Sequence, residues 1–293
     1  MTLCIGALCE DRKTIILAAD KMVGQGFIEA ELEIEKILRI HPDWWLLFAG
    51  TVPHVFDIFD GVRRRLDENM HYSVDEVITV LEECYRRKRM ERAEATYLTP
   101  RGWILSEFQG GGRERLGDLL FQTLDASIAN YRLDLELLVA GFDKDGLAHL
   151  VSVENPGISS RHDIPGYHAI GNGMFGALYF MFYRSMSVKM NASEGLYHTF
   201  EAQVFGYQAG SIGEETDFVV ARFEQEPIRL QESALPILMR LWNRFAPRPT
   251  KSLDTALGKY VSSSDLKSKP TKRRRARIRA SGPETPDLDL EEP

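Results

Sequence analysis

The sequence predicts an α+β fold built on antiparallel sheets. Apolar runs of strand length occur in pairs joined by short polar turns, as in residues 2–9 and 14–20, which is typical of β-hairpins. Segments with apolar residues at three- and four-residue spacing separate these pairs and indicate helices. Because short hairpins join antiparallel strands, the pattern excludes a doubly wound parallel sheet.

The first fifty residues are predicted to hold four strands. The polar turn EDRK joins the first two, and ELEIEKILRI (31–40) pairs across His41-Pro42 with DWWLLFAG (43–50). Strict alternation of apolar and charged residues over 31–40 indicates a strand with one buried face. Lys36 stands in the apolar row of that strand. Either its ammonium reaches water past its neighbours, or it belongs to a buried site, where an ammonium costs several kcal/mol unless it is paired.

The middle and end of the chain alternate helices and strands. A helix is predicted from the spacing of apolar residues between 55 and 66, and a second begins at Ser73, whose S-x-x-E with Glu76 is a capping box, and runs into the nineties. The further predicted segments are an inserted loop at 98–116, a helix at 117–131, a hairpin turning at 144–146, a strand near 167–170, two helices, a strand near 216–223 and an extra C-terminal helix within 228–246.

The composition changes at about Pro247. The last segment, KPTKRRRARIRASGPETPDLDLEEP, has a basic run followed by an acidic run and almost no large apolar residues. Such a segment cannot form a core, so we expect one domain over 1–246 and a disordered tail over 247–293. The basic run either binds a nucleic acid, a membrane surface or another partner, or is simply a solvated tail.

Composition narrows the class of protein. Hydrophobic residues make up 44% of the 293 residues, enough for a sizeable core, and the net charge of −7 gives no reason to expect the body to bind nucleic acid. No apolar run approaches a membrane span, and the start lacks the basic stretch of a signal peptide. The three cysteines, Cys4, Cys9 and Cys84, form no CxxC, which argues against a disulfide framework or a zinc site. We therefore expect a cytoplasmic protein.

Three residues of the N-terminal half occur at a distinctive spacing. Asp20 ends the run IILAAD, Lys36 follows sixteen residues later, and Gly50 in LLFAGT follows after fourteen more. Together with TLCIGALCEDRKTIILAAD, EKILRI, ELLVAGFDKDGLAHLVSVE, GYHAIGNGMFGAL and GEETDFVVAR, this makes residues 2–223 resemble the β-subunits of the proteasome and their bacterial peptidase relatives, which are N-terminal-nucleophile (Ntn) hydrolases. The resemblance implies a four-layer αββα sandwich, with two antiparallel sheets between two layers of helices.

The resemblance also implies a threonine nucleophile at the start of the mature chain. Removal of Met1 would give Thr2 a free α-amine, whose unperturbed pKa of about 7.7–8.0 suits it as the base that activates the threonine hydroxyl. Lys36 would favour the neutral amine, Asp20 would hold Lys36, and the backbone N–H of Gly50 would face the oxyanion.

The spacing departs from the family at the first strand. The family separates nucleophile and aspartate by about sixteen residues, whereas Thr2 and Asp20 are eighteen apart and Cys4 lies sixteen before Asp20. One explanation is a longer hairpin turn that absorbs two residues and leaves Thr2 as the nucleophile. The other makes Cys4 the nucleophile after removal of three residues. A third is that both are strand residues of a silent subunit.

The supporting residues also differ from the family pattern. Asn172 stands where the family usually has a serine, and Gln208 stands where it has an acid, while Ser211 matches the supporting hydroxyl. Gly171, Gly173 and Gly176 spell G-x-G-x-x-G, but the following sequence predicts helix on helix instead of a βαβ unit, so we expect no dinucleotide. No cofactor or metal is expected.

The sequence therefore predicts a threonine-type peptidase or amide hydrolase that acts on a peptide or protein substrate. The resemblance implies assembly into a homo-oligomeric ring and an ATP-dependent unfolding partner. The alternative is a catalytically silent ring scaffold, or an interaction protein that works through its basic tail.

Overall fold

The computed structural model describes residues 2–25, 28–31, 35–208, 215–230 and 234–246, and only the backbone over 22–31 and at 208. The chain divides into two units, residues 1–246 and 247–293. The second unit, with the basic and acidic runs and the expected disorder, lies outside the described residues.

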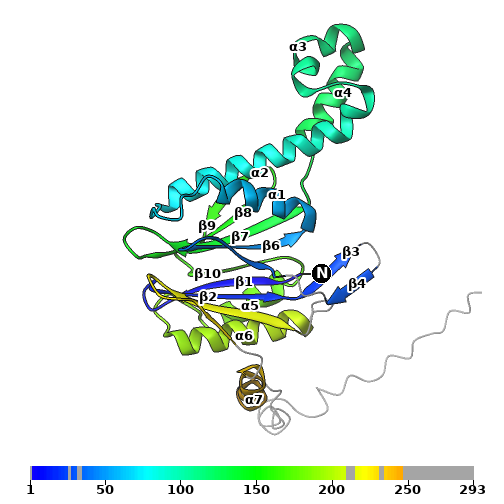
Figure 1. Ribbon diagram of the computed structural model, residues 1–293. Coiled ribbons are helices and arrows are strands. Elements are labelled where there is room, and N and C mark those ends of the chain that lie inside the picture. Colours follow the sequence, from blue (N-terminus) through cyan, green and yellow to red (C-terminus); the bar gives the residue numbers. More distant parts are fainter. Residues whose placement is uncertain (1, 26–27, 32–34, 209–214, 231–233, 247–293) are drawn as a thin grey trace, which may run out of the picture. The chain divides into compact units, whose positions relative to one another are not determined.

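The described residues form an α+β fold with two five-stranded antiparallel sheets (Figure 1). The first sheet has the strand order β10-β1-β2-β11-β12 and the second β5-β6-β7-β8-β9, while β3 and β4 pair with each other. The strands are β1 Cys4–Cys9, β2 Thr14–Asp20, β3 Met22–Gln25, β4 Ile28–Glu31, β5 Ile37–His41, β6 Trp44–Gly50, β7 Leu135–Phe142, β8 Ala148–Glu154, β9 Ile158–Arg161, β10 Tyr167–Ile170, β11 Thr216–Arg222 and β12 Ile228–Arg229. The predicted hairpins β1–β2, β5–β6 and β7–β8 are confirmed.

Seven α-helices accompany the sheets in the described part of the chain. They are α1 Val52–Arg63, α2 Val74–Tyr97, α3 Leu105–Leu116, α4 Asp118–Ala129, α5 Met174–Tyr183, α6 Ala192–Gln208 and α7 Leu235–Phe245, with a 3-10 helix at Thr99–Arg101. The predicted capping box of α2 is present, with the Ser73 hydroxyl accepting from the Glu76 N–H and the Glu76 carboxylate accepting from the Ser73 N–H. No described helix has the length and apolar character needed to span a membrane.

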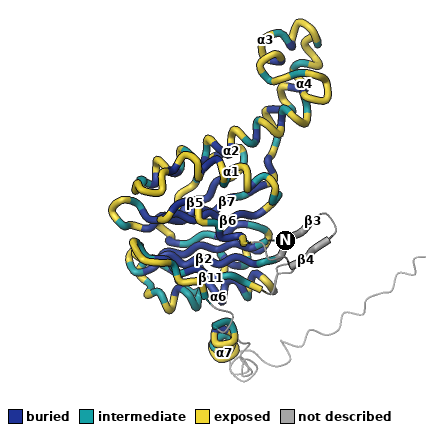
Figure 2. Tube along the Cα trace, viewed as in Figure 1, coloured by how far each residue is buried: buried dark blue, intermediate teal, exposed yellow. Residues whose placement is uncertain are grey.

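The core follows from the alternation of side chains along β1. Cys4 and Leu8 point toward the second sheet and pack in the cluster between the sheets, whereas Leu3 and Ile5 point toward α5 and α6. A third cluster joins the outer face of the second sheet to α1 and α2. Figure 2 shows the buried residues concentrated in the two sheets. Because both faces of each sheet are covered, β1 and β2 are buried at every position.

The strand predicted over residues 31–40 is wrong in its extent. Its first part belongs to β4, which ends at Glu31, residues 32–34 lie outside the described residues, and β5 begins only at Ile37. Lys36 lies at a bend before β5. Leu38 and Ile40 pack toward the helices, and the bend turns Lys36 away from that row to Asp20 on the other sheet.

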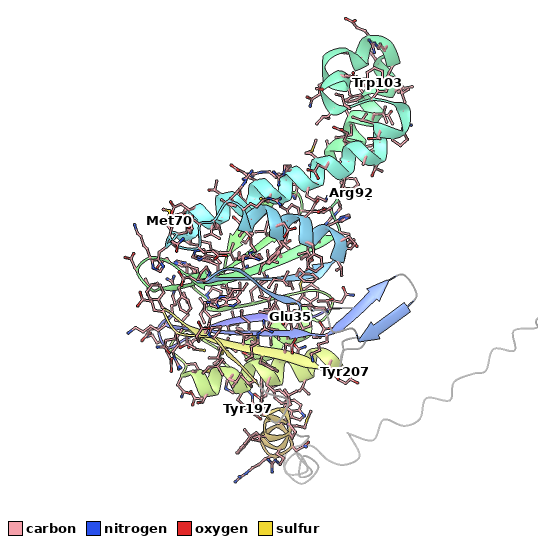
Figure 3. The ribbon with its side chains drawn as sticks, viewed as in Figure 1. Glu35, Met70, Arg92, Trp103, Tyr197 and Tyr207 are labelled. Carbon is pink, nitrogen blue, oxygen red and sulfur yellow. The ribbon has the colours of Figure 1, made fainter. Side chains whose placement is uncertain are left out.

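The inserted loop predicted at 98–116 is mostly helical. The 3-10 helix and α3 occupy it, and with α4 they form a small lobe at the end of α2 (Figure 1). The lobe has a core of its own, where Phe108 stacks on Phe121 with ring centroids 4.7 Å apart. The glycines that suggested a loop lie inside α3, and Gly112 allows this close approach, since a Cβ there would lie 3.0 Å from Phe108. Trp103 marks the lobe in Figure 3.

Arg89 of α2 holds the end of α4. Its buried guanidinium donates to the carbonyls of Tyr131, at 2.8 Å, and of Ile128 and Ala129. We expect Arg89→Met to lower the free energy of unfolding by about 2–4 kcal/mol. The variant loses the hydrogen bonds from the charged guanidinium to the three carbonyls, and it loses the positive charge at the C-terminus of α4. Urea unfolding measures this. The control Arg92→Met, an exposed position on the same helix (Figure 3), should change stability by less than about 0.5 kcal/mol. Equal losses in both variants would contradict the role of Arg89.

The C-terminal part of the domain begins with a strand. The helix predicted within 228–246 is α7, and it starts only at Leu235. Ile228 and Arg229 instead form β12, which pairs with β11 and extends the first sheet. Leu238 and Trp242 of α7 pack in the cluster that α5 and α6 share with that sheet.

Candidate active site

Thr2, Asp20 and Lys36 come together at one end of the first sheet. The Lys36 ammonium donates to Asp20 Oδ1 at 2.8 Å and to Thr2 Oγ1 at 3.1 Å. Lys36 is only 2% exposed and Asp20 1%. The ammonium therefore bridges a buried carboxylate and a threonine hydroxyl, an arrangement in which little water screens its charge.

The pairing of β1 with β2 builds this arrangement. The register places Cys4 opposite Ala19, so that Leu3 lies beside Asp20 at the end of the ladder. The Asp20 N–H donates to the Leu3 carbonyl at 3.2 Å, and the Leu3 N–H donates to Asp20 Oδ1 at 2.9 Å. The carboxylate that holds Lys36 is thus itself held by the backbone next to Thr2.

Gly171 packs directly against Thr2. It follows β10 with φ +88°, and a Cβ there would lie 2.2 Å from the Thr2 carbonyl oxygen and 3.2 Å from Cβ of Ala49. Its N–H donates to Glu136 Oε2 at 2.9 Å. Glu136 was missed by the sequence analysis, although a single charged residue inside the apolar strand LELLVAGF is a signal of the same kind as Lys36.

Gly50 lies at the same end of the sheets. It is the last residue of β6 and has φ +116°, and a Cβ there would lie 2.3 Å from the Asp134 carbonyl oxygen. The Thr51 N–H donates to that same oxygen at 2.9 Å. The neighbouring residue, Ala49, is the one whose Cβ would lie 3.2 Å from a Cβ added at Gly171. The backbone at Gly50 therefore has a conformation that only glycine adopts readily.

Cys4 is the first residue of β1, two residues after Thr2, and it packs in the cluster between the sheets. It is 0% exposed, and its thiol donates to the Phe48 carbonyl at 3.4 Å. Burial raises the pKa of the Cys4 thiol to about 12, although the nearby Lys36 charge lowers it in part. The thiolate needed for nucleophilic attack is thus disfavoured here.

We expect the native protein to resist alkylation at Cys4. Raising the pKa from about 8.5 to 12 cuts the thiolate fraction roughly a thousandfold, and burial excludes the reagent as well. Peptide mass spectrometry after iodoacetamide treatment at pH 8 should find Cys4 unmodified in the native protein and modified in denaturant. Native labelling at the rate of an ordinary exposed thiol would contradict this.

The remaining candidates are not brought to the Thr2 site by any described contact. Ser211 lies outside the described residues, and only the backbone of Gln208, the last residue of α6, is described. Asn172 is exposed in the turn between β10 and α5.

The glycines of G-x-G-x-x-G lie in a different context from a dinucleotide site. The chain continues from Gly171 through α5 and α6 to β11, which pairs antiparallel with β2, so no βαβ unit forms. Within the described ranges, no three His, Cys, Asp or Glu side chains are grouped as metal ligands would be. No protein-family model and no curated protein matches the sequence. The functional argument therefore depends on the geometry around Thr2.

Proposed function

We propose that this protein is a threonine-type Ntn hydrolase that cleaves amide bonds in peptides or proteins through an acyl-enzyme on Thr2. The observation that carries the proposal is the buried Lys36 ammonium, placed between Asp20 and the Thr2 hydroxyl at 2.8 and 3.1 Å. A hydroxyl at the second residue, with a desolvated cation at hydrogen-bond distance, is the constellation that such chemistry requires.

The fold supports the proposal. Two antiparallel sheets pack against each other, with α1 and α2 on the outer face of one and α5 and α6 on the outer face of the other. We assign this packing to the four-layer αββα sandwich of the Ntn hydrolases, in which the nucleophile lies at the start of a central strand. The three cysteines are free, which supports placing the enzyme in the reducing cytoplasm.

The mechanism begins with the removal of Met1, which frees the α-amine of Thr2. The amine takes the proton of Oγ1 as Oγ1 attacks the carbonyl carbon of the scissile amide. The adjacent Lys36 ammonium keeps the amine in its uncharged, proton-accepting form and stabilises negative charge that develops on Oγ1. The Gly50 N–H is assigned to the oxyanion of the tetrahedral intermediate.

Collapse of that intermediate breaks the C–N bond. The leaving nitrogen takes the proton from the α-ammonium, and an ester remains on Thr2. Water, deprotonated by the same amine, then attacks the ester and releases the carboxylic acid, which regenerates the hydroxyl. Asp20 acts through Lys36 and is a positioning residue in this scheme.

The second candidate function is a catalytically silent ring scaffold of the same fold. The exposed Asn172, at the position where the family usually has a serine, favours it. In both candidates we propose assembly with further copies of the chain and, for the enzyme, an ATP-dependent unfolding partner.

Intact-mass spectrometry separates the two candidates. The purified protein should lack Met1 and should gain the mass of a threonine-directed epoxyketone inhibitor at Thr2. Retention of Met1 with no adduct would rule out the catalytic assignment and leave the scaffold. An adduct that maps to Cys4 would reassign the nucleophile.

A further inference from the structure

The exposed face of α5 is unusually rich in aromatic side chains. Phe175, Tyr179, Phe182 and Tyr183 are 65–75% exposed. The first three follow each other at four- and three-residue spacing, so they share one side of the helix. The opposite side of α5 is packed, with Ala177 and Met181 buried against the first sheet.

The face continues beyond the helix. A cavity of about 490 Å³ lies beside it, lined by His162, Pro165, Tyr167, His168, Phe175, Leu178, Tyr179 and Phe182. A second hollow shares three of these residues and extends the surface to Ile164, which is 95% exposed. We call the surface formed by Ile164, Phe175, Tyr179, Phe182 and Tyr183 the α5 face.

The five residues of the α5 face are uncharged, and the Arg184 guanidinium at its edge, 6.0 Å from the Tyr183 ring centroid, is paired with the buried Glu201. Residues 174–183, MFGALYFMFY, contain no charged side chain. The imidazoles of His162 and His168 stack with centroids 3.6 Å apart, and burial lowers the pKa of His168 to about 4, so this ring is neutral at physiological pH. A nucleic acid or another charged partner would need complementary charges, which this face lacks. The partner must itself be apolar.

The area of the face lies between that of a monomer's usual largest apolar patch and that of one side of a stable interface. Four aromatic side chains of about 150–250 Å² each, exposed to the extent given above, contribute roughly 400–700 Å². A monomer's largest apolar patch is typically about 300–600 Å², and a stable dimer buries about 800 Å² on each partner. The side chain of Ile164, which is 95% exposed, brings the area of the α5 face closer to the 800 Å² of one partner. The tail 247–293 contains few large apolar residues and is poorly suited to cover it.

We propose that the α5 face docks on the α5 face of a second copy of this chain. A two-fold axis near Tyr179 brings the same uncharged aromatic surface from both copies together, and no charge is buried without a partner. Aromatic side chains of one copy fill the cavity beside His168 of the other. The contact does not rest on the hydrolase assignment, because a silent scaffold would use the same face.

Sedimentation equilibrium of the full chain at micromolar concentrations tests this contact. Phe182→Glu should weaken self-association more than about 100-fold, since it places a carboxylate in an apolar interface. The matched control is Leu119→Glu, an 81% exposed apolar residue on α4, which should leave the assembly mass unchanged. Circular dichroism confirms that both variants fold. A monomeric wild type, or equal masses for wild type and Phe182→Glu, would overturn the proposal.

Cross-linking tests the geometry independently. Tyr179→Cys should form a disulfide between two copies under mild oxidation, whereas Leu119→Cys should not. Failure of Tyr179→Cys to cross-link would overturn the two-fold arrangement. Hydrolysis measured on the same samples is a separate readout, so a failure of this contact is distinguishable from a failure of the proposed activity.

Discussion

Lys36→Met should abolish formation of the inhibitor adduct on Thr2 and reduce amide hydrolysis by at least about 100-fold. Methionine keeps the length and apolar stem of the side chain but removes the ammonium that lies 3.1 Å from Thr2 Oγ1. Without that charge the α-amine is protonated more readily and the developing alkoxide loses its nearest donor. Mass spectrometry of the adduct and steady-state hydrolysis of a fluorogenic peptide measure the two effects.

Lys36→Met should also destabilise the fold, so a control must separate the loss of stability from the loss of activity. Removing the cation 2.8 Å from the buried Asp20 carboxylate costs about 3–5 kcal/mol. The double variant Lys36→Met/Asp20→Asn removes both charges and keeps an oxygen for the Leu3 N–H. Its stability in urea should return toward wild type while activity stays lost. Activity that returns together with stability would show that Lys36 acts only on folding.

Gly171→Ala should damage the site directly, because the added methyl group would contact Thr2. Its Cβ would lie 2.2 Å from the Thr2 carbonyl oxygen, and its φ of +88° is strained for alanine. We expect a loss of about 2–4 kcal/mol in the free energy of unfolding and displacement of Thr2 from Lys36, with at least a tenfold loss of hydrolysis. Urea unfolding and peptide hydrolysis test the two parts.

Gly102→Ala is the matched control for backbone strain. Gly102 has φ +71° but has open space at the Cβ position, so alanine there should cost only about 1–2 kcal/mol and leave hydrolysis intact. If the two variants had the same stability and activity, contact with Thr2 would not be the cause of the Gly171 effect.

Local patterns predicted most of the secondary structure. The hairpins β1–β2 and β7–β8 and the capped start of α2 follow from alternation, turn residues and the S-x-x-E motif, because each depends on residues close in sequence. The helix predicted at 117–131 is confirmed as α4, but α3 was missed. Its glycines suggest a loop, yet Gly112 is needed for the contact of Phe108 with Phe121, and that contact involves a second helix.

The candidate site was predictable in part. Lys36 and Asp20 were identified by charge placed among apolar residues, and the structure pairs them. Glu136 carried the same kind of signal, but its role depends on the approach of Gly171 from thirty-five residues away. Such a contact between segments distant in sequence leaves no local pattern.

The sequence alone gives the main hairpins, most of the helices, and a lysine and an aspartate that need partners, but not α3, β12 or the true bounds of the strand predicted at 31–40. It left both Thr2 and Cys4 as candidate nucleophiles, because Cys4 has the family's sixteen-residue spacing to Asp20 and Thr2, eighteen residues away, needs a longer hairpin turn. Their environments differ only once the chain is folded. Packing of the second sheet over β1 excludes water from Cys4 and raises its thiol pKa, whereas Thr2, beyond the end of the strand, stays partly exposed and in contact with the ammonium.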